Sequence, residues 1–124
     1  GYARSADYAN SVRDYEEVIA SPGAQDSDFY LAAFNALYTE DYLKAEKWFN
    51  TVLKNGEENN ETWFRSATLF YLSYINMELG NYDKALMFLD KLIEMESDGN
   101  LPLPEVGMCS GAKLRTEIES RKKN

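Results

Sequence analysis

The sequence predicts a single all-α domain built from stacked helix hairpins. Apolar residues recur every three or four positions along the chain, the spacing that places side chains on one face of a helix. Three thirteen-residue segments also resemble one another; they begin at Asp7, Asp41 and Asn81, each with Tyr second and a small residue fifth. Alternation of apolar and polar residues, typical of strands, persists nowhere, so no sheet is expected.

Three of the six expected helices follow from these repeated segments: 3–20, 42–54 and 82–96. In each, the Tyr, the small residue and the apolar tail lie on one helical stripe. The first stripe includes Tyr8, Ser11, Tyr15 and Ile19; the second includes Tyr42, Ala45, Phe49 and Leu53; the third includes Tyr82, Ala85, Leu89 and Ile93.

The other three expected helices, 27–39, 60–79 and 105–121, are bounded by breaks in the pattern. Pro and Gly in "SPGAQDSD" precede the first, and "LGN" from Leu79 is a tight turn after the second. "KNGEENN" from Lys54 reads as a polar loop with Gly56 just past a helix end. "SDGNLPLP" from Ser97 is the longest break.

The composition suits one globular domain without affinity for nucleic acid. The chain has 124 residues, 44% of them hydrophobic, and a net charge of −8. Residues 1–112 carry a net −11, which repels nucleic acid and anionic membranes, whereas residues 113–124 carry +3. Cations at the end of a last helix complement its dipole; a basic contact tail is the alternative. No apolar run is long enough to insert this segment into a membrane.

The repeat resembles the tetratricopeptide repeat family. The first two copies begin 34 residues apart, and a period near this value in a helical chain indicates a solenoid of hairpins. The family's bulky and small positions are matched in the second copy by Phe29, Ala33, Ala45 and Phe49, and in the third copy by Ser73, Gly80, Ala85 and Leu89.

The resemblance implies a right-handed α–α superhelix of about six helices. Its parts are the second helix of a partial repeat (3–20), a repeat (26–59), a repeat with a longer first helix (60–96) and a capping helix (105–121). The small run Cys109–Ala112 would bring this capping helix close to the fifth helix, with Lys113, Glu117 and Arg121 facing water.

No catalytic, metal or cofactor site is expected. The chain has no His, which excludes Ser-His-Asp and Cys-His catalysis and His-based metal sites. Cys109 is the only cysteine, so no disulfide forms within the chain, and it is interpreted as a packing thiol. No glycine-rich phosphate-binding motif occurs. We therefore expect no enzyme activity.

The expected binding surface is the concave groove, which the resemblance assigns to the first helix of each repeat. The positions carried over from the family are Tyr30, Phe34, Leu37, Tyr38, Phe70, Tyr74, Met77 and Glu78. None is the Lys, Asn or Arg with which the family's best-known members clamp an acidic C-terminal tail. An aromatic groove suits an apolar or amphipathic helix, or an extended peptide. The alternative is that these aromatics are core, covered by the sixth helix, the partial first repeat or a second copy.

Two functions follow as hypotheses. The first is a non-enzymatic module that binds a protein or peptide through the groove. The second is a structural or self-assembly domain, a homodimer for example, of a larger and membrane-anchored bacterial envelope protein. The compartment stays open between a periplasmic or extracytoplasmic location and the cytoplasm.

Overall fold

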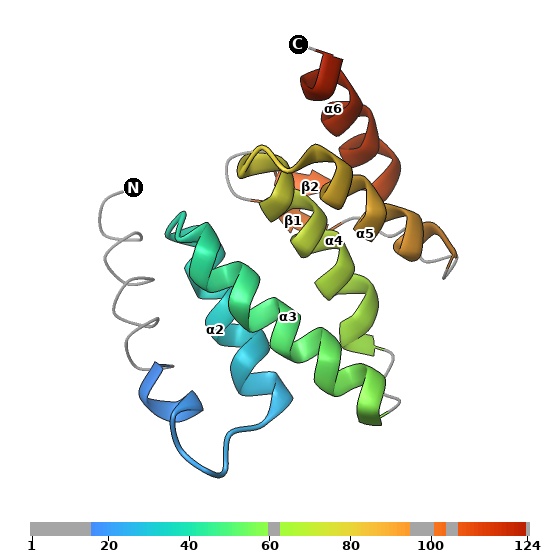
Figure 1. Ribbon diagram of the computed structural model, residues 1–124. Coiled ribbons are helices and arrows are strands. Elements are labelled where there is room, and N and C mark those ends of the chain that lie inside the picture. Colours follow the sequence, from blue (N-terminus) through green and yellow to red (C-terminus); the bar gives the residue numbers. More distant parts are fainter. Residues whose placement is uncertain (1–15, 60–62, 95–100, 104–106, 124) are drawn as a thin grey trace.

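The computed structural model describes residues 16–59, 63–94, 101–103 and 107–123, and confirms the all-α class (Figure 1). Residues 16–19 are helical and precede five longer helices. These are α2 (Asp26–Tyr38), α3 (Tyr42–Asn59), α4 (Trp63–Glu78), α5 (Tyr82–Glu94) and α6 (Gly111–Lys123). Between α5 and α6 lie two short strands, β1 (Leu101–Leu103) and β2 (Gly107–Cys109). None of the helices in the described ranges is long and apolar enough to cross a membrane.

The helices form two hairpins that stack on one another, followed by α6. In chain order each helix packs on the next: α2 on α3, α3 on α4, α4 on α5 and α5 on α6 (Figure 1). In such an arrangement each hairpin buries an apolar face against its neighbour, as in a helical solenoid. The first repeated segment lies mostly outside the described residues, because only its residues 16–19 belong to them.

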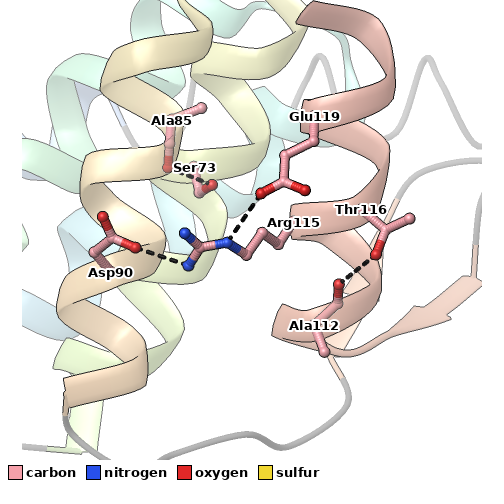
Figure 2. A network of polar contacts seen from close by, with 7 residues as sticks. All are labelled: Ser73, Ala85, Asp90, Ala112, Arg115, Thr116 and Glu119. Atoms are coloured by element: carbon pink, nitrogen blue, oxygen red, sulfur yellow. Dashed lines mark hydrogen bonds and ion pairs between the residues drawn. The ribbon is translucent and has the colours of Figure 1, made fainter. Parts of the chain in front are cut away.

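Small residues lie where the helices of each hairpin cross. Ala33, Ala45, Ser73 and Ala85 are all fully buried, as the packing interpretation of the repeat requires. At the second crossing the hydroxyl of Ser73 donates a hydrogen bond of 2.8 Å to the carbonyl oxygen of Ala85 (Figure 2). The bond gives the buried hydroxyl a partner and ties α4 to α5 at the closest point of the hairpin.

The two hairpin turns have the same backbone design but different residues. After α4, the N–H of Gly80 donates to the carbonyl of Met77 and that of Asn81 to the carbonyl of Asn76, at 3.1 and 2.8 Å. After α2, Glu40 and Asp41 donate to Leu37 and Ala36, at 3.1 and 2.9 Å. Both patterns are Schellman motifs, whose capping residue has a positive φ. That residue is Gly80 at 82° and Glu40 at 62°.

Helix α3 is longer than expected. It continues to Asn59, and Gly56, which was expected just past its end, is a buried residue inside the helix. A glycine inside a helix costs about 1 kcal/mol relative to alanine, an amount that tertiary packing readily overrides. The prediction of a loop from Lys54 was therefore wrong.

The segment before α6 also differs from expectation. Residues 101–103 and 107–109 form an antiparallel strand pair in which Leu101 faces Cys109 and Leu103 faces Gly107. The first strand lies where a break was expected, and the second lies where the last helix, 105–121, was expected, so the predicted start of that helix was wrong. Strands of three residues are too short to show a period of two in the sequence. Helix α6 accordingly begins at Gly111, and the hydroxyl of Ser110 accepts a hydrogen bond from the N–H of Lys113 at 3.2 Å, which caps its first turn.

The basic residues of α6 pair with acids on other helices. Arg115 pairs with Asp90 of α5 at 2.7 Å and with Glu119 (Figure 2); Lys122 pairs with Asp83 of α5. Arg121, expected to face water, pairs with Glu78 of α4 at 3.2 Å. Such exposed pairs are worth about 0–1 kcal/mol each. Burial of Leu114 and Ile118, worth about 1.5–3 kcal/mol each, therefore contributes most to docking α6.

Substitutions at the two turn residues should change the free energy of unfolding in opposite directions. Glu40→Gly should raise the free energy of unfolding by about 0.5–1 kcal/mol, because glycine adopts a positive φ without a Cβ penalty but loses more chain entropy on folding. Gly80→Ala should lower it by a similar amount; since no atom lies within 4 Å of the added Cβ, the loss is conformational. Urea unfolding followed by circular dichroism measures both, and shifts of the same sign would contradict the assignment of the turns.

Candidate functional site

Three aromatic side chains form a row along α2. Tyr30, Phe34 and Tyr38 are spaced by four residues, so they lie on one helix face, and each is half-buried. The rings of Phe34 and Tyr38 are 4.7 Å apart between centroids. We call these three residues the α2 aromatic row. Leu37, predicted for the same surface, is fully buried in the core.

The aromatic row rests on rings from the neighbouring helices. Tyr30 meets Phe49 of α3 edge-on at 5.7 Å, and Phe34 meets Tyr71 of α4 edge-on at 5.8 Å. Phe49 and Tyr71 stack on each other at 5.5 Å with an angle of 19°. Because Tyr30 and Phe34 each pack against a buried inner ring, the core holds these two rings in place, and Tyr38 packs in turn on Phe34.

The predicted positions on α4 are more deeply buried than those on α2. Phe70 is fully buried, while Tyr74 and Met77 keep 4% and 3% of their surface exposed, and Glu78 is half-buried. Tyr74 contacts the ring of Tyr42 from α3, with centroids 6.5 Å apart. Sequence reasoning did not select Tyr71 or Tyr42. Tyr42 was assigned to the packing stripe of its helix and Tyr71 follows another aromatic residue, Phe70, and the family positions alone do not show which of these rings meet.

A pocket of about 500 Å³ lies where α4, the strand pair and α6 meet. Its apolar lining comes from Tyr74 and Met77 of α4, Leu103 and Cys109 of the strands, and Leu114 of α6. Helix α6 therefore lies over the predicted positions Tyr74 and Met77 of α4. This arrangement agrees, at these two positions, with the alternative in which the sixth helix covers the predicted surface.

Charged side chains from α4 and α6 surround the mouth of this pocket. Arg121 lies between two carboxylates, at 3.2 Å from Glu78 and 2.9 Å from Glu117. Lys113 lines the same pocket and is exposed, as predicted, but it forms no ion pair with any described residue. In the described part of the chain no group of three or more Cys, Asp or Glu side chains is placed to hold a metal ion.

Comparison with known proteins assigns the fold to a family. Residues 26–102, from the start of α2 into β1, match the family described as "Prolyl 4-hydroxylase peptide-substrate-binding domain". The chain belongs to this family. Because the family is a variant of the tetratricopeptide repeat, the resemblance found in the sequence is confirmed.

A curated relative agrees with this family. Mouse (Mus musculus) "Prolyl 4-hydroxylase subunit alpha-1" is 35% identical to this peptide-substrate-binding domain over 92 residues, which cover 64% of the present chain. The chain spans about 17% of the length of that relative. No solved structure matches the chain.

Burial raises the pKa values of three tyrosines of α2 and α4. Removal from water raises the pKa of Tyr30 above the usual value for tyrosine. The pKa values of Tyr71 and Tyr74 are raised strongly, mainly by burial, and for Tyr74 also by the negative charge of Glu78. These phenols therefore stay uncharged to a higher pH than an exposed tyrosine does.

Alkaline conditions should destabilise the domain before its buried phenols ionise. Their pKa is raised in the fold and near 10 in the unfolded chain, so their contribution to stability is complete below about pH 10 and is lost as the pH rises above it. Urea unfolding between pH 8 and 11 should show a falling free energy above pH 10. Tyr71→Phe should reduce the slope of this fall. Ionisation of all nine tyrosines near pH 10 with the fold intact, seen by absorbance at 295 nm, would contradict the prediction.

Proposed function

We propose that this domain binds a proline-containing peptide, in an extended conformation, along the α2 aromatic row. The observation that carries the proposal is the row itself, which lies on one face of α2. Tyr30 packs on Phe49, Phe34 packs on Tyr71, and Tyr38 packs on Phe34. The family description supports the peptide, and the words "prolyl 4-hydroxylase" support the presence of proline in it.

The dimensions of the row fit a polyproline II segment. Residues eight apart on a helix are separated by about 12 Å along its axis. A polyproline II helix repeats after three residues, or about 9 Å, so about four residues of peptide would cover the row. This helix is already extended before it binds, which lowers the entropy lost on docking, and aromatic grooves are a common site for it. These features favour an extended peptide over the amphipathic helix that the sequence left open.

The role proposed for the chain is substrate binding without catalysis. The family description refers to a domain that binds the peptide substrate, and the relative is a much longer enzyme subunit. In our proposal the domain holds the peptide for a catalytic part elsewhere in a longer protein. The absence of His from the chain supports this division of labour.

Shortening the aromatic row should weaken binding of an oligoproline of about ten residues. Phe34→Ala and Tyr38→Ala should each lower the affinity by about three- to tenfold, since an aromatic contact is worth about 0.5–1.5 kcal/mol. Isothermal titration calorimetry measures the change. Met87→Ala, which shortens an exposed apolar side chain on α5, is the matched control and should bind normally.

The peptide control is a chain of equal length with alanine in place of proline, which should bind more weakly. Circular dichroism shows whether each variant stays folded; if Phe34→Ala unfolds, Tyr38→Ala carries the test. Equal affinity for both peptides, or unchanged binding by both folded variants, would refute the proposal.

Sedimentation equilibrium on the same samples measures the oligomeric state and so distinguishes self-assembly from peptide binding. It requires a dimer that buries the aromatic row, so Tyr38→Ala would shift the protein towards monomer. A monomer that binds oligoproline supports peptide binding instead.

A further inference from the structure

The pocket between α4, the strand pair and α6 lies about one helical turn along α4 from a ring that supports the aromatic row. Tyr71 supports Phe34 of the aromatic row, and Tyr74, one helical turn further along α4, lines the pocket. A peptide that leaves the row across α4 towards α6 therefore reaches the pocket next. Much of the pocket is built by residues beyond 102, where the family match ends, including Leu103, Cys109 and Leu114.

The pocket has the construction of a site for an apolar group. Its volume of about 500 Å³ lies within the range of ligand sites, about 300–1,000 Å³, so it has room for an apolar side chain. Its interior is lined by Met77, Leu103 and Leu114, all buried, so an apolar side chain placed there would leave water for an apolar surface.

At the mouth of the pocket, the position beside Lys113 favours a negatively charged group of a ligand. The charge of Arg121 is already balanced by Glu78 and Glu117. Lys113 has no ion pair within the described residues and lies in the first turn of α6, where the helix dipole adds to its positive potential. Among the described residues of the rim, its ammonium group is therefore the cation without an ion pair.

We propose that this pocket is a second subsite for the same peptide, which receives an apolar side chain and pairs an adjacent carboxylate with Lys113. The inference rests on the proposed function, since it places the subsite on the same peptide. It adds a sequence preference: beside its prolines, the ligand carries a residue such as Leu next to Glu or Asp.

The experiment compares end-blocked peptides of about ten residues that share one oligoproline segment. The last two residues are Pro-Pro, Leu-Glu, Leu-Gln or Ala-Glu, and a second set carries the same pairs at the first two positions. In one of the two sets, Leu-Glu should bind about tenfold more tightly than Pro-Pro, because of the buried leucine. Loss of the carboxylate in Leu-Gln should cost about two- to fivefold, the range of an exposed ion pair.

Two variants of α6 test the location. Lys113→Glu should reverse the preference between Leu-Glu and Leu-Gln. Thr116→Phe places a bulky ring at an exposed position on the pocket wall and should remove the gain from leucine. Lys123→Glu is the matched control for charge, because Lys123 is an exposed cation of α6 that does not line the pocket, and it should keep both preferences.

The unique thiol gives an independent readout. Cys109 lines the pocket and is the only cysteine, so the Leu-Glu peptide should slow its alkylation by iodoacetamide more than the Pro-Pro peptide does at equal occupancy.

Three results would overturn the subsite. If oligoproline binds but Leu-Glu adds nothing at either end, the subsite is wrong and the groove stands. If no peptide binds, both proposals fail. If 4-phenylbutyrate protects Cys109 in a manner that depends on Lys113, while the peptides do not differ, the pocket is a site for a small apolar carboxylate.

Discussion

The stacked rings of Phe49 and Tyr71 hold together both the fold and the proposed binding surface. Phe49 belongs to the first hairpin and Tyr71 to the second, and their contact at 5.5 Å joins the two. The outer rings of Tyr30 and Phe34 lean on this pair from α2. Because the support is fully buried, the outer rings lose little freedom when a ligand docks, which favours affinity through preorganisation.

The small residues at the hairpin crossings make this stack possible. Ala33 and Ala45 in one hairpin, and Ser73 and Ala85 in the other, let the helix axes approach closely, so that the large rings meet in the layer between hairpins. Packing of this kind depends on volume, and a solenoid repeats the same volumes at the same positions. The repeated segments of the sequence therefore reflect packing, whereas the proposed binding surface lies mainly on the helices between them.

The difference between packing positions and surface positions explains which features the sequence could predict. The period of the apolar residues located most of the helices and their turns, because these depend on local spacing, and the resemblance to the tetratricopeptide repeat assigned the crossing residues. The period did not locate the end of α3, where packing overrides the low helix propensity of Gly56, nor strands as short as β1 and β2.

The site was predictable only in part, for a related reason. Family positions placed Tyr30, Phe34 and Tyr38 on one accessible face, but also selected Leu37 and Phe70, which the core encloses. Whether a ring on a solenoid helix is core or surface depends on the next element, and here that element is α6. Its ion pairs with Glu78 and Asp90 join residues 43 and 25 positions apart, a relation that spacing along the chain does not reveal.

The central claim is that proline residues contact the α2 aromatic row. Intermolecular nuclear Overhauser effects between oligoproline and the isotope-labelled chain test it most directly. The account predicts contacts from proline ring protons to the rings of Tyr30, Phe34 and Tyr38. Contacts to the exposed side chains of Leu43 and Met87 on α3 and α5, with none to the row, would contradict it.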